Sequence, residues 1–354
     1  MSDWTNSVLT GDVRERLDDL PDDSIHMVMT SPPYFGLRDY GHDDQIGLED
    51  ELDAYIEELV GVFRDLRRVL RPDGSAWLNL GDSYAQDDAD EFGRKNKMLV
   101  PHRVAIALQS DGWVVRNDVT WLKPNTMPSP VKDRLNTTTE QIFHLTPNPD
   151  YWYDLDAIRE PHAEASKERM KYGKNGVEND DENYGHNESG GVNAAVETTK
   201  EQYHPAGKNP GDVFEVTTKP FPDAHFAVYP PELVETPLKA TCPPTVCAEC
   251  GSPYERNALP KPDKTPDPTI PFKQTCDCDT DATEPGIALD PFAGAGTTLL
   301  KAKELGRRFV GVELNPEYAD MARARIGLSP KDPANVRSDD SQTGIEAYTD
   351  GGNS

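Results

Sequence analysis

The first 160 residues alternate between short apolar runs and longer amphipathic patterns. IHMVMT at 25–30 is a mostly apolar run of strand length, which is typical of a buried strand. Over 50–70, apolar residues recur at three- and four-residue spacing, which predicts an amphipathic helix, and RPDG at 71–74 ends it. This alternation predicts an α/β fold. It continues with a strand at 75–80, a helix at 101–110, and strands near 113–119 and 141–145.

The later part of the chain changes character several times. Residues 161–212 are rich in Lys, Glu, Asn, Gly and Tyr and show no aliphatic periodicity, so we expect a long variable insertion. Strand and helix patterns resume after it, and Asn315-Pro316 is a favourable start for the last helix. We divide the chain into a first α/β half (1–160), the variable insertion (161–212), a short ordered segment (213–241), a cysteine-containing insertion (242–285), a second α/β half (286–327) and an acidic tail expected to be disordered (328–354).

A glycine-rich turn links a strand to a helix in IALDPFAGAGTT, residues 287–298. Small residues let the backbone approach a ligand closely. Glu313 ends the next strand, 19 residues after Gly294, where a carboxylate can bind ribose hydroxyls. The spacing matches neither a dinucleotide fingerprint nor a P-loop. The pattern favours an adenosyl ligand without phosphates, and the alternative is a purely structural strand-to-helix turn.

A second unusual loop, TSPPY at 30–34, follows the strand at 25–30. Prolines cannot donate to a β ladder, so the strand must end there and the loop is rigid. The loop presents the hydroxyl of Ser31, the proline carbonyls and the ring of Tyr34. A simple turn would explain these residues in isolation, whereas a ligand that docks on the loop would explain all three groups.

Two of these segments resemble parts of one enzyme family. DPFAGAGTT resembles the S-adenosylmethionine loop of amino-methylating DNA methyltransferases, and TSPPY resembles their catalytic loop. The catalytic loop comes first here, which is similar to the β-class of these enzymes. Residues 11–34, 121–145 and 224–235 also resemble blocks of the family. The resemblance implies a Rossmann-like class I methyltransferase fold with a seven-stranded, mostly parallel sheet and a circularly permuted motif order.

The resemblance also implies a cofactor, a substrate and a set of site residues. The cofactor would be S-adenosylmethionine, and the substrate would be duplex DNA with its target base flipped out. Ser31 Oγ and the Pro32 carbonyl would accept hydrogens of the target amine while Tyr34 stacks on the base. The implied catalytic residues are Ser31, Pro32, Pro33 and Tyr34. The implied cofactor-binding residues are Asp12, Phe226, Asp290, Pro291, Phe292, Gly294, Gly296, Thr297, Thr298 and Glu313.

Ser31 bears on the choice of base. The adenine enzymes of the family mostly carry Asp or Asn before Pro-Pro-Tyr, whereas Ser is most often seen in N4-cytosine enzymes. We therefore expect N4-methylation of cytosine, with N6-adenine or an RNA base as alternatives. Similar chains from salt-loving organisms commonly target CTAG, which we take as the expected site. The enzyme would act beside a cognate restriction endonuclease or alone, as a monomer or homodimer. A catalytically silent, zinc-containing DNA-binding protein is the alternative of another class.

Five cysteines are present, and four of them fall in two close pairs. Cys247 and Cys250 form a CxxC pair, and Cys276 and Cys278 form a CxC pair. Four thiolates suit a tetrahedral zinc ion, so we expect a small zinc knuckle with a structural or DNA-contacting role. The alternative is an unmetallated loop with reduced thiols. We expect Cys242 to pack in the interior.

The large negative net charge of the chain does not decide whether it binds nucleic acid. The formal net charge is −27, and a strongly acidic chain usually repels nucleic acid. At molar salt the Debye length is about 3 Å, so surface repulsion is largely screened. We interpret the charge as adaptation of a halophile to a salty cytoplasm. On this interpretation, net charge excludes no nucleic-acid partner.

One segment is locally basic. Residues 92–139 contain eight Lys or Arg against three Asp or Glu. Lys123, Lys132 and Arg134 are therefore expected to contact phosphates, within a target-recognition region at roughly 125–215. The alternative for each is ordinary solvated charge. No basic start with an apolar run is visible at the N-terminus, and no apolar segment approaches ~20 residues. We expect a cytoplasmic protein with no membrane partner.

Overall fold

The structure is a computed structural model. It describes residues 4–37, 45–86, 92–164, 204, 206–219, 228–256 and 272–328. Most of the predicted insertion at 161–212 and nearly all of the tail at 328–354 lie outside the described residues, as does Phe226. Within the described residues, no helix is long and apolar enough to cross a membrane.

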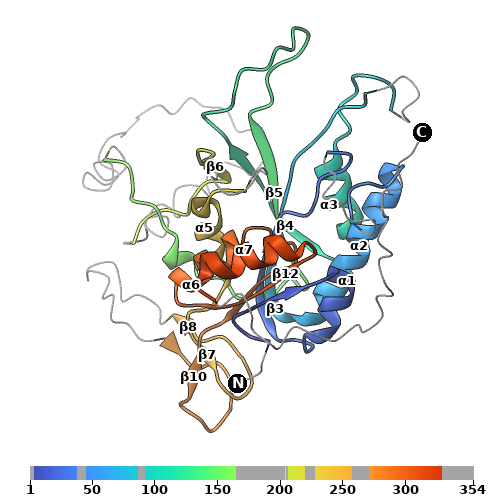
Figure 1. The fold of residues 1–354 in the computed structure, drawn as a ribbon. Helices are drawn as coiled ribbons and strands as arrows, with labels where there is room; N and C mark the ends of the chain where they lie inside the picture. Colours follow the sequence, from blue (N-terminus) through green and yellow to red (C-terminus); the bar gives the residue numbers. More distant parts are fainter. Residues whose placement is uncertain are drawn as a thin grey trace, which may run out of the picture.

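An eight-stranded sheet forms the centre of the described part of the molecule (Figure 1). In spatial order its strands are β1 (Ser7–Thr10), β12 (Arg308–Glu313), β11 (Ile287–Asp290), β2 (Ile25–Thr30), β3 (Leu70–Leu80), β5 (Thr139–Thr146), β4 (Val114–Leu122) and β6 (Val213–Glu215). The first five strands are parallel, and β5 is antiparallel to both β3 and β4. The predicted mostly parallel sheet is confirmed, and β6 adds a three-residue eighth strand parallel to β4.

Strands from the two ends of the chain interleave in this sheet. β1 pairs with β12 so that Thr10 lies opposite Glu313, and β11 pairs with β2. These strands are parallel, so the carboxyl ends of β1, β2, β11 and β12 lie side by side at the same end of the sheet. This pairing brings the loop at 30–34 beside the glycine-rich turn despite their separation in sequence.

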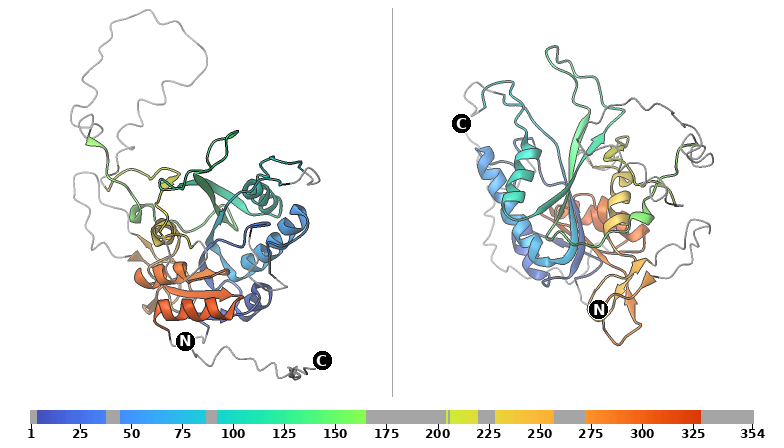
Figure 2. Two further views of the ribbon diagram at one scale, coloured as in Figure 1. Left: turned by 45° about the horizontal axis from the view of Figure 1, so that its top comes forward. Right: turned by 180° about the vertical axis from the view of Figure 1, so that it is seen from behind.

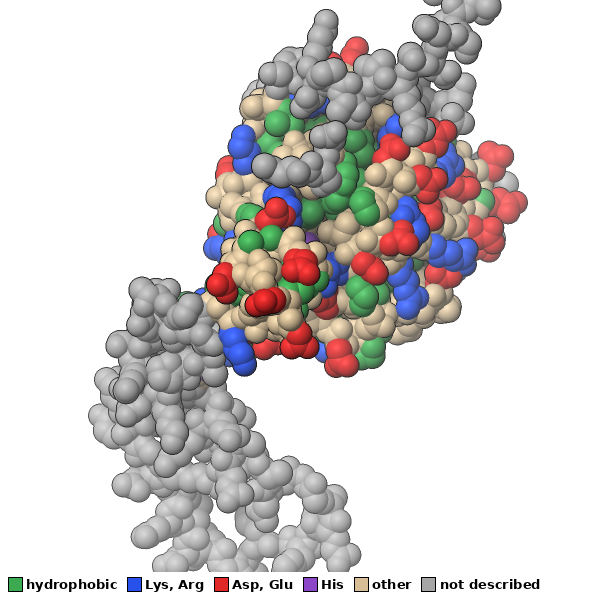
Figure 3. Space-filling view, turned by 90° about the horizontal axis from the view of Figure 1, so that it is seen from below, with side chains coloured by type: hydrophobic (Ala, Val, Ile, Leu, Met, Phe, Trp, Pro, Cys, Tyr) green, Lys and Arg blue, Asp and Glu red, His purple; other side chains and the backbone are tan. Residues whose placement is uncertain are grey.

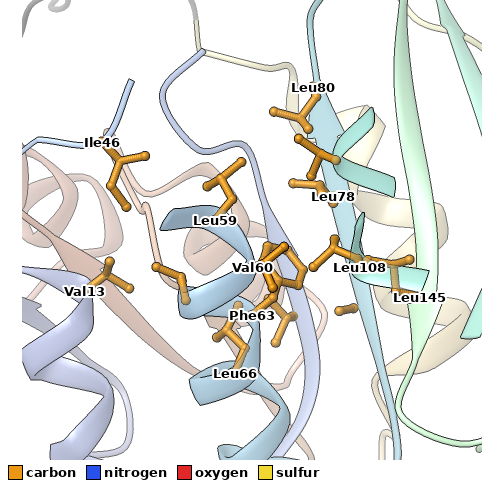
Figure 4. Close-up of a cluster of buried hydrophobic side chains, with 14 of the residues drawn as sticks. Val13, Ile46, Leu59, Val60, Phe63, Leu66, Leu78, Leu80, Leu108 and Leu145 are labelled. Carbon is orange, nitrogen blue, oxygen red and sulfur yellow. The ribbon is translucent and has the colours of Figure 1, made fainter. Parts of the chain in front are cut away.

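Helices cover both faces of the sheet (Figure 2). Two helices, α2 (Leu52–Val69) and α3 (Val100–Ser110), lie on one face, and α5 (Pro231–Thr241), α6 (Thr297–Glu304) and α7 (Pro316–Ile326) lie on the other. The helices predicted at 50–70 and 101–110 are confirmed. On β2, Val28 packs into the hydrophobic core between the sheet and α2, whereas Met27 and Met29 pack into the core on the other face. Figure 4 shows part of the core under α2.

The start of β3 differs from the sequence prediction. The pattern places this strand at 75–80, but β3 begins at Leu70, directly after α2 ends at Val69. Leu70 pairs with Ile25, and the register then shifts before Met27 pairs with Ser75. A bulge of this kind accommodates the proline of the RPDG segment, which cannot donate to the ladder. The prediction that RPDG ends the helix is confirmed.

Small elements project from the two ends of the sheet. β7 (Val246–Cys247) pairs with β10 (Thr283–Glu284), and β8 (Glu255–Arg256) pairs with β9 (Phe272–Lys273), at the lower end in Figure 1. At the upper end, the connection between β4 and β5 extends well beyond the sheet. We call residues 123–138 the β4–β5 arm. The short helix α1 (Val13–Arg16) follows β1 and leads directly into the 3-10 turn Leu17–Asp19; a second 3-10 turn spans Leu155–Ala157.

Candidate active site

A cavity of about 350 Å³ opens where β1, β2, β11 and β12 end. Ten of the residues singled out in the sequence as catalytic or cofactor-binding line it: Asp12, Ser31, Pro32, Pro33, Tyr34, Pro291, Phe292, Gly294, Thr297 and Glu313. Asp290, Gly296 and Thr298 are not among the lining residues but adjoin it in the chain. The structure thus brings residues of the two distant loops together around one cavity, and their catalytic and cofactor-binding roles stay predictions.

The glycine-rich turn is shaped by close backbone contacts. Gly296 precedes α6 with a φ of 74°, and a Cβ added there would lie 3.0 Å from the Cβ of Ala322. Only glycine fits both the left-handed conformation and the close approach. The backbone N–H of Gly294 donates to Glu313 Oε2 at 2.7 Å, and that of Asn315 donates to Oε1 at 2.9 Å. Burial raises the pKa of Glu313, while these two donors oppose the shift.

Asp290 lies behind the cavity and ties three segments together. Its Oδ1 accepts from the Thr30 hydroxyl at 2.9 Å, and its Oδ2 accepts from the Tyr229 hydroxyl at 2.9 Å. Tyr229 also shares a hydrogen bond with Thr298. Burial raises the pKa of Asp290, because the charged form loses hydration that the hydroxyl donors only partly replace. Asp290 thus braces the two loops, and its predicted contact with a cofactor stays a prediction.

The SPPY loop, residues 31–34, is held from both sides. The Pro33 carbonyl accepts from the Tyr55 hydroxyl of α2 at 2.8 Å. On the other side, Tyr34 packs against Gly81, where an added Cβ would lie 2.5 Å from the ring. Ser31 Oγ donates to the Tyr34 hydroxyl at 3.3 Å. Burial and the neighbouring Glu140 raise the pKa of Tyr34 well above its ordinary value, so the phenol stays protonated.

A polar cluster beside Tyr34 contains Glu140, to which the sequence interpretation gave no role although it lies in the block at 121–145. Glu140 of β5 accepts from the Tyr34 hydroxyl at 2.9 Å and from Asn79 Nδ2 at 3.1 Å. Its other oxygen pairs with the ammonium group of Lys123, which also lies 4.3 Å from the centre of the Trp121 ring. In the sequence, Lys123 and Glu140 share the block at 121–145, and Asn79 is a polar residue near the end of an otherwise apolar run.

Asp12 lines the cavity but is engaged by a neighbour. It caps α1 by accepting from the backbone N–H of Arg14 at 2.8 Å, and it forms a salt bridge with the Arg14 guanidinium. Burial favours a higher pKa for Asp12, but the hydrogen bonds and charge of Arg14 lower it. The carboxylate is thus fixed in orientation, and its contact with a cofactor stays a prediction.

Comparison with known proteins connects this geometry to a family. A family model described as DNA methylase, of the N6 and N4 methyltransferase type, matches residues 25–324. The chain belongs to this DNA methylase family. It is therefore a DNA methyltransferase that uses S-adenosylmethionine, as the resemblance of the two loops predicted. The reversed order of those loops does not prevent the match, which spans both of them.

Individual relatives agree over almost the whole length. The Type II methyltransferase M.SmaI of Serratia marcescens is 34% identical over 340 residues, covering 90% of each chain. The Type II methyltransferase M.SfiI of Streptomyces fimbriatus is 33% identical over 413 residues, covering 88% of this chain and 89% of that protein. The solved structure of the PvuII DNA methyltransferase (cytosine-N4-specific) has a TM-score of 0.55 at 18% identity and covers 92% of this chain and 89% of that one. That likeness confirms the methyltransferase fold.

The three basic residues expected to contact DNA do not lie together in this methylase. Lys123 lines the cavity and pairs with Glu140. Lys132 and Arg134 lie exposed on the β4–β5 arm, and the Arg134 guanidinium sits 3.9 Å from the centre of the Tyr84 ring. The arm also exposes Met127 and Leu135 almost completely. Phosphate contacts by these three residues stay predictions, and the position of Lys123 is better suited to orienting Glu140.

The four cysteines of the methylase converge. The sulfur atoms of Cys247, Cys250, Cys276 and Cys278 all lie within 4.8 Å of one another, and we call them the cysteine cluster. Four convergent thiols match the ligand number of structural zinc. The prediction that Cys242 packs in the interior is confirmed, because it is fully buried in the core beside α5.

The cysteine cluster lies at the end of the sheet opposite the cavity. His26, near the start of β2, contacts the Gly251 carbonyl through Nε2 at 3.0 Å. Arg71, near the start of β3, donates to the Cys250 carbonyl at 3.1 Å. Acidic and basic side chains are interspersed over the face seen from this end (Figure 3). The cluster is thus anchored to strand starts, whereas the candidate active site lies where the same strands end.

Proposed function

We propose that this methylase transfers the methyl group of S-adenosylmethionine to the exocyclic N4 amine of cytosine in duplex DNA. The observation that carries the proposal is Ser31, which stands directly before Pro32, Pro33 and Tyr34 and lines the cavity. A hydroxyl before Pro-Pro-Tyr favours cytosine, whereas the family's adenine enzymes mostly carry Asp or Asn there. N6-methylation of adenine is the rival within the family.

The residues of the glycine-rich turn fit an adenosyl cofactor. Glu313 uses its two oxygens to accept from the N–H groups of Gly294 and Asn315, and each oxygen keeps a lone pair for a ribose hydroxyl. Pro291 and Phe292 supply apolar lining beside them. When bound, the cofactor supplies an electrophilic methyl group at its sulfonium. The chain's own task is to hold that group in line with the amine and to exclude water.

The SPPY loop supplies acceptors for the amine. An exocyclic amine is a poor nucleophile, because its lone pair is delocalised into the ring. Ser31 Oγ and the Pro32 carbonyl can accept its two hydrogens and favour a more tetrahedral nitrogen. The Pro33 carbonyl already accepts from Tyr55, while among the described residues no hydrogen bond reaches the Pro32 carbonyl. The rigid loop keeps these acceptors in place before the base arrives.

Three finer assignments belong to the same proposal. The cysteine cluster holds a structural zinc ion; the convergence of its four thiols supports this assignment. The recognition sequence is CTAG, as the resemblance suggested. The methylase works beside a cognate restriction endonuclease, in keeping with relatives that carry the name Type II methyltransferase.

Removing the Ser31 hydroxyl tests its proposed role as an acceptor for the target amine. The same variant distinguishes an enzyme from a catalytically silent DNA-binding protein. In Ser31→Ala, we expect methyl transfer to fall by about 10²-fold or more, because one acceptor of the amine is lost. Binding of DNA, measured by fluorescence anisotropy, should be unchanged. Ser110→Ala on the exposed end of α3 is the matched control and should keep full activity. An unchanged rate in Ser31→Ala would remove this hydroxyl from the mechanism.

A further inference from the structure

Methylation of an amine leaves a proton to be removed. The nitrogen forms a bond to the methyl carbon, the carbon–sulfur bond breaks, and its electron pair stays on sulfur. The methylated nitrogen then carries one hydrogen too many and a positive charge. Ser31 and the Pro32 carbonyl can accept hydrogen bonds from it, but neither an alcohol nor an amide oxygen keeps a proton at neutral pH. A base must therefore lie further along the hydrogen-bond path.

The hydrogen bonds behind Ser31 run in one direction. Ser31 Oγ donates to the Tyr34 hydroxyl at 3.3 Å, and the Tyr34 hydroxyl donates to Glu140 Oε2 at 2.9 Å. Each hydroxyl thus donates to the next oxygen of the path and keeps a lone pair that can accept a proton from the preceding group. The path ends on the Glu140 carboxylate, which is the only one of the three groups that can keep an additional proton at neutral pH.

We propose that Glu140 is the terminal proton acceptor of methyl transfer and that Ser31 and Tyr34 conduct the proton to it. The nitrogen gives its proton to Ser31 Oγ, Ser31 passes its own hydrogen to the Tyr34 oxygen, and Tyr34 passes its own to Glu140 Oε2. Both hydroxyls are regenerated, and Glu140 becomes a carboxylic acid. The proposal rests on transfer to an exocyclic amine and holds for either base of the family.

The surroundings of Glu140 suit this role. Lys123 from β4 pairs with Oε1 and leaves Oε2 to Tyr34 and to the amide of Asn79 from β3. Among the described residues that contact the carboxylate, Lys123 and Tyr34 are titratable and Asn79 is neutral; the neutral Trp121 ring lies beside Lys123. The side chain is 17% exposed, so the proton can later leave to solvent. Because Tyr34 is held as a phenol, it must donate one proton as it accepts another.

The other carboxylates of the cavity are engaged elsewhere. Asp12 forms a salt bridge with Arg14 and caps α1. Glu313 binds the N–H groups of Gly294 and Asn315 in the cofactor half of the cavity. Among the described residues, no chain of hydrogen bonds links either carboxylate to Ser31, whereas Glu140 is two hydrogen bonds from it. Position and connectivity therefore single out Glu140.

The test is the pH dependence of single-turnover methyl transfer in Glu140→Gln. We expect the rate at neutral pH to fall by about 10²- to 10⁴-fold, the usual contribution of a positioned base. We expect the rate of the unmodified protein to decline toward low pH, and this decline should disappear in Glu140→Gln. The dissociation constant of S-adenosylmethionine, measured by calorimetry, should change less than twofold. A purely structural role would alter binding or stability but would leave the shape of the pH profile intact.

Further variants keep the test decisive. Tyr34→Phe retains the ring for stacking but breaks the path, so it should lose the same limb of the pH profile. Glu140→Asp keeps a carboxylate, so it should be slower yet retain that limb. Glu57→Gln, on the exposed side of α2, removes an equal charge and should behave as the unmodified protein. Wild-type rate and profile in either Glu140→Gln or Tyr34→Phe would overturn the proposal.

This experiment separates the inference from the proposed function. If the unmodified protein transfers no methyl group to DNA, the proposed function fails before any variant is compared. If it transfers methyl groups and Glu140→Gln behaves identically, the proton path alone fails. Loss of the low-pH decline in Glu140→Gln supports the proton path, whether the methylated nucleobase proves to be cytosine or adenine.

Discussion

Thr30 donates a 2.9 Å hydrogen bond to Asp290, across 260 positions of the sequence. Thr30 is the last residue of β2 and directly precedes the SPPY loop, while Asp290 ends β11 and opens the glycine-rich turn. Both side chains are buried. This contact fixes the two halves of the site relative to each other, so that amine acceptors and cofactor residues face one cavity.

The hydrogen bond between the loops can be removed by Thr30→Val, which keeps the shape of the side chain. Asp290 then loses one of its donors in the interior, and we expect the free energy of unfolding to fall by about 1–3 kcal/mol. Urea denaturation measures this loss. Thr217→Val replaces an exposed threonine and should leave the unfolding midpoint unchanged. Equal midpoints for the two variants would show that the joint contributes nothing to stability.

Glu313 should matter for cofactor binding rather than for DNA binding. In Glu313→Gln, the charged acceptor for the ribose hydroxyls is lost, and hydrogen bonds to charged groups contribute about 1.5–3 kcal/mol. We expect about 10- to 100-fold weaker binding of S-adenosylmethionine, measured by calorimetry. Burial raises the pKa of Glu313, so cofactor affinity should decline on acidification at a higher pH than an exposed glutamate would produce. Unchanged affinity would place the ribose elsewhere.

Stability should fall on acidification because two histidines are buried in the neutral form. Burial lowers the pKa of His144 to about 3 and that of His26 to about 4. The unfolded chain binds these protons below its ordinary histidine pKa of about 6.5. Stability is therefore complete above that pH and declines as the pH falls toward 4 and then 3.

His144→Phe tests this sign. The ring can still stack on Trp77, whose centroid lies 4.2 Å away, but it can no longer take up a proton. Between pH 6 and 4, the slope of unfolding free energy against pH should drop by up to about 1.4 kcal/mol per pH unit. His102→Phe, at a half-exposed position, is the control. A slope unaffected by His144→Phe would contradict the neutral, buried state.

The cysteine cluster should bind one zinc ion per chain and act on stability. We expect metal analysis of the purified protein to find zinc, and Cys276→Ser to lose it together with several degrees of thermal stability. Cys242→Ala is the matched control, because Cys242 lies in the apolar core and should leave the zinc content unchanged. The cavity lies at the opposite end of the sheet, so folded Cys276→Ser should retain its affinity for S-adenosylmethionine. Full zinc content in Cys276→Ser would rule out this ligand set.

Local patterns in the sequence were sufficient for much of the fold. The apolar run at 25–30 forms β2. The last helix, α7, begins at Pro316 with Asn315 as its N-cap, as predicted, because the Asn315 side chain accepts from the N–H groups of Glu317 and Tyr318. The glycine-rich turn and the SPPY loop were found for the same reason. Each is a continuous stretch whose residue types serve one local backbone geometry. The interpretation of the acidic surface as a salt adaptation stays a prediction.

Contacts between distant strands were beyond those patterns. Glu140 meets Tyr34 because β5 pairs with the side of β3 that faces away from β2. The sequence block at 121–145 contains Glu140 but does not indicate this contact. The link from Tyr229 to Asp290 depends in the same way on tertiary packing. Lys123 was read as a phosphate contact from local basic charge, yet it lies beside Glu140 in the cavity. Such relationships follow from the sheet order rather than from any single segment.

Identification of the methylated nucleoside tests the central claim most directly. The purified protein would be incubated in high potassium chloride with methyl-labelled S-adenosylmethionine and unmethylated duplex DNA, with RNA as a control. The product would then be digested, and the labelled nucleoside would be identified by mass spectrometry. Our account predicts N4-methylcytosine in DNA. N6-methyladenine would contradict the role assigned to Ser31, and label in RNA alone would contradict the proposed DNA substrate.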